Sequence, residues 1–247
     1  MSSSELEKEP LLKKARWYND RNRTYKACLC YLQILQQNPE HRQCVKELAA
    51  LYFDRGDYEQ AVLCLEHLVS REPGNQDYGM KLVHAYMHLN RYTLAWNYLV
   101  DPSNFNEHME EERVLSLSQC ELNLGNPLQC LNLLSDLIDA NPMPFYFVLQ
   151  AETLENLGMH DVALEVARRG LKRDPYYEEL LSLRGRIHLR QKDFKKAREV
   201  YLKMIKNQLY LGEAQCDIED ALYQYSNPPE LVELMQYFDD FPLLEEE

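Results

Sequence analysis

Residues 48–73, LAALYFDRGDYEQAVLCLEHLVSREP, are the stretch that decides the fold. Gly56 can take the left-handed conformation that ends a helix, and Asp57 can then cap the next helix. Pro73 blocks any continuation of that second helix. Between these marks the apolar residues recur at helical spacing, as at Val62, Leu65, Leu68 and Val69. The stretch therefore predicts a hairpin of two helices.

The same pattern recurs along the chain with a period close to 34 residues. Each repeat has a small residue in its second helix, where the paired helices approach closely, at Ala27, Ala61, Ala95, Cys130, Ala163 and Ala197, in steps of 34, 34, 35, 33 and 34 residues. From the second repeat onward a turn signature comes before this residue, as at Gly56-Asp57-Tyr58 and Asn90-Arg91-Tyr92. A helix hairpin cannot cover its own apolar face, so we expect neighbouring repeats to stack.

The chain resembles the tetratricopeptide repeat family at Leu48-Ala49, Tyr52, Gly56-Asp57-Tyr58, Ala61, Leu65 and Pro73. The resemblance covers roughly residues 8 to 209, as about six repeats starting near 8, 42, 76, 111, 144 and 178. It implies an all-α fold, the α-α superhelix of antiparallel helix hairpins. We expect an N-terminal extension at 1–7, the repeat solenoid at 8–211, and acidic capping helices with a tail at 212–247.

The third repeat departs from the pattern because Asp101-Pro102 interrupts its second helix early. Proline in a helix interior costs about 3 kcal/mol, so we expect this helix to end near Val100 and a loop to run from Asp101 to Glu107. One interpretation is a surface insertion without a function. The other is a hinge or a binding loop that carries Phe105.

The charge of the chain restricts the class of its partners. The net charge is −13 over 247 residues, and residues 212–247 carry eleven Asp and Glu with no Lys, Arg or His. The first 211 residues carry 27 bases and 29 acids, and are therefore close to neutral. This distribution argues against nucleic acid and against an anionic membrane surface as partners. No apolar run is long enough to insert into a bilayer.

The cysteines and the N-terminal sequence indicate where the chain resides. Seven cysteines at irregular spacing are no disulfide framework, and the N-terminal stretch has no apolar signal core. We therefore predict a reducing compartment, the cytoplasm or alternatively the nucleus.

The sequence contains no motif of a catalytic or cofactor-binding site. It lacks a phosphate-cradling glycine loop, a nucleophile elbow and the H-E-x-x-H motif of zinc proteases. His84 and His88 are one helical turn apart and could supply two metal ligands. Because no third ligand follows at a defined spacing, we interpret them as exposed or partly packed histidines beside Met80 and Met87. We therefore predict that the protein is not an enzyme and holds no cofactor or metal.

The family resemblance implies that the first helix of each repeat lines a concave groove in which partners bind. In the first three repeats the predicted partner-binding residues are Lys13, Arg16, Lys46, Phe53, Met80, Lys81, His84, Met87 and His88. The later repeats offer Leu115, Gln119, Leu122, Val148, Leu149, Glu152, Glu155, Arg186 and Arg190. Cationic, aromatic and thioether side chains together favour an acidic and apolar peptide or helix. The alternative is that these bases have no role, since exposed bases occur on any solenoid.

The C-terminal segment combines acidity with an amphipathic pattern. We expect a helix from Gly212 to Tyr225, a break at Asn227-Pro228-Pro229, and a second helix from Pro229 to Phe238. The apolar residues of this second helix and its continuation are Leu231, Leu234, Met235, Phe238 and Phe241. They predict that the segment caps the exposed end of repeat six. Alternatively, the segment recruits a basic partner in trans.

Taken together, the sequence predicts a non-catalytic interaction scaffold or adaptor, a subunit of a multiprotein complex. A dedicated chaperone or escort for one client protein is the alternative, and the regulatory arm of an enzyme is a third interpretation.

Overall fold

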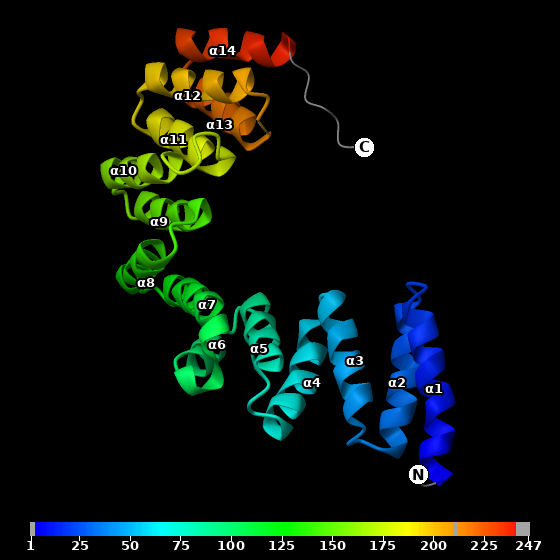
Figure 1. Ribbon diagram of the computed structural model, residues 1–247. Helices are drawn as coiled ribbons and strands as arrows, with labels where there is room; N and C mark the ends of the chain where they lie inside the picture. Colours follow the sequence, from blue (N-terminus) through cyan, green and yellow to red (C-terminus); the bar gives the residue numbers. More distant parts are fainter. Residues whose placement is uncertain (1–2, 210–211, 241–247) are drawn as a thin grey trace. The chain divides into compact units, whose positions relative to one another are not determined.

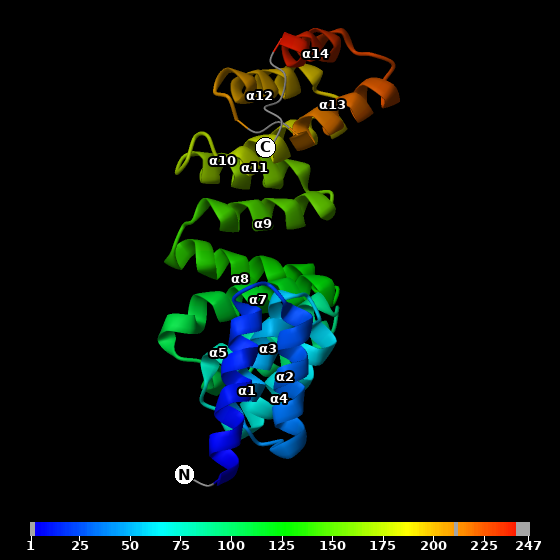
Figure 2. The same ribbon diagram turned by 90° about the vertical axis from the view of Figure 1, so that its right-hand side faces the viewer.

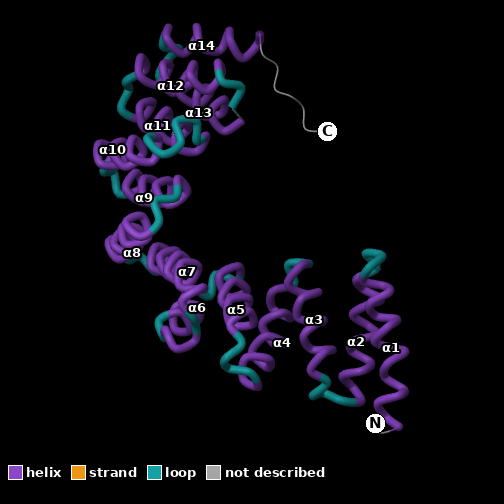
Figure 3. Tube along the Cα trace, in the orientation of Figure 1, coloured by secondary structure: helices purple, strands orange, loops and turns teal. Residues whose placement is uncertain are grey.

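The computed structural model describes residues 3–209 and 212–240, and this part of the chain consists of helices joined by loops and turns, with no strand (Figure 3). The first half contains α1 Ser3–Asn19, α2 Thr24–Gln37, α3 Arg42–Asp54, α4 Tyr58–Arg71, α5 Gln76–His88, α6 Tyr92–Leu99, the short 3-10 turns η1 Pro102–Asn104 and η2 Glu107–Met109, and α7 Glu110–Asn123. The second half contains α8 Pro127–Ala140, α9 Pro144–Asn156, α10 His160–Leu171, α11 Glu178–Arg190, α12 Phe194–Lys206, α13 Gly212–Gln224 and α14 Pro229–Asp240 (Figure 1).

The chain divides into two compact units, Met1–Asn126 and Pro127–Glu247, which we call unit 1 and unit 2. The division falls within the fourth repeat, between α7 and α8. Within unit 1, α1 packs on α2, α3 on α4, and α5 on α6, while α9 on α10 and α11 on α12 form hairpins in unit 2 (Figures 1 and 2). The predicted all-α fold of stacked helix hairpins is confirmed.

The N terminus differs from the expected boundary, because α1 begins at Ser3 rather than near residue 8. Residues 5–9, ELEKE, are strong helix formers, and they extend the first helix through most of the segment expected to be an extension.

The turns between paired helices have the expected left-handed residues. Gly56, Gly125 and Gly158 have φ of 76°, 85° and 74°. Asn90 and Lys192 take φ of 56° and 59° in the corresponding turns, so glycine is not required there. Asp57 stands at the N-cap of α4 as expected, but its side chain makes no capping hydrogen bond. The carboxylate instead pairs with Arg55, at 3.2 Å from Nε, because that guanidinium lies across the same turn.

The small residue of each repeat lies in the core. Ala27, Ala61, Ala95, Cys130, Ala163 and Ala197 are all at most 2% exposed. Any larger side chain there would have to push two packed helices apart. Within each unit, this position therefore sets how closely the paired helices pack, as in α3 with α4 and α9 with α10.

The interruption in the third repeat has a packing role. α6 ends at Leu99, with Val100 at its C-cap, as predicted. Phe105 then returns to the core with 8% exposure, and its ring meets Tyr98 edge to face at 5.8 Å between centroids. Asn104 Nδ2 donates to the Tyr98 carbonyl oxygen at 3.0 Å. Phe105 therefore fixes the segment to unit 1, and a binding loop that presents this ring to a partner is the wrong interpretation.

The second C-terminal helix covers the last hairpin. α14 packs on α12, and Leu231 and Leu234 are fully buried. Arg198 of α12 pairs with Glu233 of α14 at 3.2 Å. The Phe238 side chain and Phe241, also expected to contribute, lie outside the described residues.

The buried alanines generate a test of the packing. We expect Ala61→Leu and Ala163→Leu each to lower the free energy of unfolding by roughly 1–3 kcal/mol through overpacking. Thermal and denaturant melts measure the effect. Gln60→Leu places the same side chain at the neighbouring exposed position and serves as the control. Equal melting of the buried and exposed variants would show that these helices do not meet at the alanines.

The buried leucines of α14 generate a second test. Truncation after Asn227 removes the cover of α12, so we expect a lower Tm and aggregation. The full chain with Val232→Ala, at an exposed position of α14, is the control and should melt like the wild type. An unchanged Tm in the truncated chain would contradict a capping role.

Candidate functional site

The candidate site is a surface of unit 1 formed by α3, α5 and α7, the first helices of successive hairpins. It includes a depression of about 540 Å³ lined by His84, Met87, His88, Tyr92, Gln119 and Asn123. Within α5 and α7 the lining residues are three or four positions apart, so they lie on one face of each helix. We call this surface, together with Phe53 and Tyr58, the unit 1 groove.

Aromatic rings form one wall of the unit 1 groove. The imidazole of His88 stacks on Tyr58 with 4.2 Å between centroids and an interplanar angle of 2°. Phe53 meets Tyr58 edge to face at 5.4 Å and His88 at 6.4 Å. Phe53 is only half-buried, which leaves apolar ring surface for a partner.

His84 is not part of a metal site in this structure. Its Nε2 lies 3.6 Å from the Glu112 carboxylate. Burial lowers the pKa of His84 and the Glu112 charge opposes this, but the net shift is downward, so the imidazole is neutral at neutral pH. In the part of the chain that the structure describes, no group of three or more His, Cys, Asp or Glu could hold a metal ion.

Two of the predicted cations are exposed on the helices that carry this wall, about two turns before Phe53 and His88. Lys46 of α3 and Lys81 of α5 have no ion pair among the described residues. The Lys46 ammonium lies 5.9 Å from the centroid of the Tyr78 ring. Both are therefore available to a carboxylate of a partner. Lys13 is also exposed, but it lies on α1, four helices before α5, the first helix that lines the depression.

Arg16 does not contribute free positive charge. Its Nε lies 2.9 and 3.0 Å from the two carboxylate oxygens of Glu47, which also accepts from the Tyr31 hydroxyl at 2.9 Å and from Gln43. The hydrogen bond to Glu47 raises the pKa of the Arg16 guanidinium. The ion pair joins α1 to α3 across the first two repeats, so its role is structural.

Met80 is misplaced in the predicted set. Its side chain is 3% exposed and belongs to the core of unit 1. Neighbouring residues on a helix point about 100° apart, and here the step from Lys81 to Met80 turns the side chain from the exposed surface into the core. The exposed lysine belongs to the surface, and the methionine faces inward. Met87, two turns further along α5, does line the depression.

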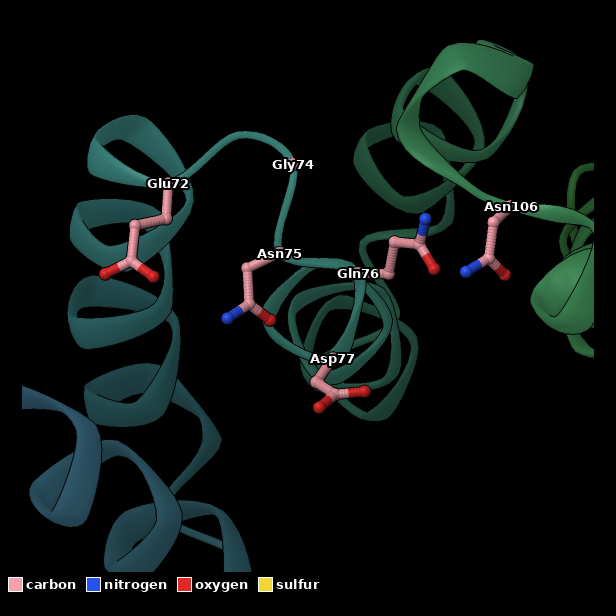
Figure 4. A pocket seen from close by; sticks show the side chains of 6 residues that line it. All are labelled: Glu72, Gly74, Asn75, Gln76, Asp77 and Asn106. Atoms are coloured by element: carbon pink, nitrogen blue, oxygen red, sulfur yellow. The ribbon is translucent and has the colours of Figure 1, made fainter.

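A second depression in unit 1, of about 560 Å³, is polar (Figure 4). Its side chains already serve the fold, because Glu72 pairs with Arg42 and Asn75 caps α5 by accepting from the Tyr78 backbone N–H. Asn106 caps η2 in the same way, by accepting from two backbone N–H groups. The polar side chains of this depression are therefore less available to a partner than the side chains of the unit 1 groove.

In unit 2 the predicted groove residues bind one another. Glu155 is 4% exposed, and its carboxylate accepts from Arg186 and Arg190, the latter at 2.8 Å. The Arg186 guanidinium, although burial opposes its charge, has a raised pKa because of Glu155. This cluster joins α9 to α11 and leaves little free charge.

Sequence reasoning missed Tyr58, Tyr92 and Asn123. The two tyrosines belong to the turn signatures Gly56-Asp57-Tyr58 and Asn90-Arg91-Tyr92, where we interpreted them only as turn marks. Their recurrence after 34 residues was the signal that could have placed them at one edge of the groove.

Comparisons with known proteins agree with this architecture. Models of the tetratricopeptide repeat match residues 47–75 and 148–208. PilW, a type IV pilus biogenesis factor, is similar in structure, with a TM-score of 0.61, 18% identity, and 85% of this chain and 97% of that chain covered. A tetratricopeptide repeat protein from Parabacteroides merdae has a TM-score of 0.57 and 18% identity, and the similarity covers 94% of this chain and 84% of that chain. MamA from Desulfovibrio magneticus has a TM-score of 0.57 and 11% identity, and the similarity covers 72% of this chain and 99% of that chain. At these identities the likeness shows the fold alone.

No curated protein matches the sequence. None of the helices in the described ranges is long and apolar enough to span a membrane.

The partly buried carboxylate of Glu47 generates a pH-dependent test. Burial raises its pKa, but the hydrogen bonds from Arg16, Gln43 and Tyr31 outweigh burial and hold the pKa below the usual 4.5. A lowered folded-state pKa stabilises the protein above the unfolded-state pKa, and this contribution is lost as the pH falls through the folded-state value. We therefore expect Glu47→Gln to destabilise the protein at pH 7, by an amount that shrinks below about pH 4.

Denaturant melts across this pH range measure the difference from the wild type. Glu107→Gln, at an exposed position of η2, is the control and should change stability little at any pH. A destabilisation by Glu47→Gln that is equal at pH 7 and pH 3 would contradict the charged ion pair.

Proposed function

Because this chain is a tetratricopeptide repeat protein, we propose that it is a non-catalytic scaffold that binds an acidic and apolar segment of another protein along the unit 1 groove. The observation that carries the proposal is the combination of Lys46 and Lys81, exposed and without ion pairs, with the aromatic wall of Phe53, Tyr58 and His88. A carboxylate of the partner would meet a lysine while its apolar side chains cover the rings and Met87.

The geometry also limits the shape of the partner. The depression is open and lies across successive helices, which suits a peptide or helix that runs along the stack rather than a small molecule enclosed in a cavity. Gln119 and Asn123 add amide groups at the α7 side, where they can pair with a peptide backbone. Binding of this kind makes the protein an adaptor or a subunit of a larger complex.

An escort for one client protein is the second candidate. Exposed thioether and aromatic surface adapts to a range of apolar segments, which suits temporary shielding of a client. An adaptor co-purifies with its partner at fixed stoichiometry, whereas an escort leaves the finished assembly. The regulatory arm of an enzyme has less support, because the groove is not a clustered catalytic set. A basic partner for the acidic C-terminal segment is a separate proposal that leaves the groove unchanged.

The cysteines support a reducing compartment, the cytoplasm or the nucleus, as the place of action. All seven are free thiols, and Cys28, Cys30, Cys44, Cys120 and Cys130 are buried. Burial raises the pKa of Cys44 to about 12 and those of Cys64 and Cys120 to about 11.

The test reverses the two groove lysines. We expect Lys46→Glu with Lys81→Glu to weaken partner capture without changing the helical circular dichroism, because like charges would then face the acidic partner. Lys172→Glu with Lys195→Glu makes the same change of net charge at exposed positions of unit 2 and is the control.

Capture is measured with a photo-crosslinking amino acid at Asn123, at the edge of the depression, in cells that express the protein. The same amino acid at Leu63, 61% exposed on α4, is the control for position. We expect cross-linked partners from position 123 that are lost on reversal of the lysines. Cross-links that survive this reversal in a folded protein, or that form equally from position 63, would show that the groove is not the main binding site.

A further inference from the structure

A second charged surface of unit 1 lies at the turn between α1 and α2, outside the groove. Four cations meet two aromatic rings there. Arg21 lies 4.2 Å and Arg23 5.9 Å from the ring centroid of Trp17. Lys14 and Lys26 lie 5.9 and 5.8 Å from that of Tyr18. We call these six residues the basic tip.

The cations of the basic tip have no carboxylate partner. In the described part of the chain, no ion pair involves any of the four. The other arginines of unit 1 are paired, as Arg16–Glu47, Arg42–Glu72, Arg55–Asp57, Arg71–Glu40, Arg91–Glu59 and Arg113–Glu110. Arg16 in the same stretch pairs with Glu47, so the positive charge of the tip comes from these four side chains, in a chain whose net charge is −13.

Apolar surface continues from the basic tip along α2. Tyr25, Leu29 and Leu32 are 70%, 49% and 40% exposed. Their spacing of four and three residues places them on one face of the helix. Trp17 adds a ring that is 45% exposed. A partner of this surface would supply acids opposite the tip and apolar groups opposite the stripe.

The same chain carries a surface of that complementary chemistry in unit 2. Cys216, Glu219, Asp220 and Tyr223 are exposed at positions three or four apart on α13, and Tyr223 is 94% exposed. Eight acids and no base lie between residues 212 and 240. We call the four exposed residues the acidic face.

We propose that the basic tip and stripe of one copy bind the acidic face of a second copy. Both surfaces pair charge with an exposed ring or apolar side chain, and their charges are opposite. A nucleic acid or an anionic membrane fits less well, because the remainder of the chain carries net negative charge and repels a polyanion. Aliphatic Leu29 and Leu32 in addition gain little against the phosphates of a nucleic acid.

Such a contact is heterologous, since different surfaces of the two copies meet. Each bound copy keeps one free basic tip and one free acidic face, so assembly continues beyond a dimer unless the geometry closes a ring. The charges lie at the surface, so salt weakens the contact. The Debye length falls from about 10 Å at 0.1 M salt to about 3 Å at 1 M.

The test is the distribution of assembly sizes by sedimentation velocity, over a range of protein concentrations, at about 0.1 M and about 1 M NaCl. We expect the full-length chain to form dimers and larger species that increase with concentration and decline with salt. Arg21→Glu with Arg23→Glu reverses the tip, and Cys216→Lys with Glu219→Lys reverses the acidic face. Each should raise the Kd for self-association about tenfold or more, because like charges then face each other.

The decisive sample is an equimolar mixture of these two variants. In the mixture each reversed surface again finds one of opposite charge, so association should return although neither variant associates alone. Lys172→Glu with Lys195→Glu alters the net charge as the tip reversal does, and should associate like the wild type. Circular dichroism and melting must show that every variant is folded.

Four results would overturn the proposal. They are a wild-type chain that stays monomeric at every concentration in low salt, association that the tip reversal leaves intact, variants that do not associate when mixed, and a tip that binds added single-stranded RNA or anionic vesicles while the chain stays monomeric. The last of these results assigns the tip to another partner. Each of these outcomes leaves the proposed role of the groove untouched, because Lys46 and Lys81 are unchanged in all variants.

Discussion

The close approach of two helices at one small side chain is the constraint on which the rest of this protein depends. At the six repeat positions that side chain is alanine or cysteine, and it is buried at each of them. A fixed approach sets where the remaining residues of both helices point, and a repeat of about 34 residues then returns equivalent positions to the same face of successive hairpins. The unit 1 groove arises in this way, since His84 of α5 and Gln119 of α7 lie about one repeat apart.

Charge pairing between repeats decides which of the many exposed cations can bind anything else. Arg16 and Glu47 join α1 to α3, and Arg186 with Glu155 joins α11 to α9. From the sequence alone these charges would be counted as available to a partner, but in the structure they pair with one another. Among the described residues, Lys46 and the four cations of the basic tip have no ion pair, and each of them lies over an aromatic ring.

The features that could be predicted from the sequence are those with a local cause. The period, the left-handed turns, the small residues and the early end of α6 at Pro102 all follow from a few neighbouring residues. The partner of Arg16 could not be predicted, because Glu47 lies 31 residues away and the pair depends on how two hairpins stack. The prediction that Met80 lies in the groove was wrong for a different reason. A step of one residue along a helix turns the side chain by about 100°, here from surface to core. The position of Phe105 could likewise not be predicted, because its contact with Tyr98 depends on three-dimensional packing.

The burial of the cysteines has a chemical consequence. A thiol with a pKa of about 11 or 12, such as Cys44, Cys64 or Cys120, is almost never a thiolate at neutral pH, and the thiolate is the species that reacts with alkylating agents and peroxides. Cys216, exposed on α13, is the thiol that such reagents reach in the folded chain. The number of modified cysteines therefore reports whether a molecule is folded. One modified sulfur indicates a folded chain, and several indicate a chain that has unfolded.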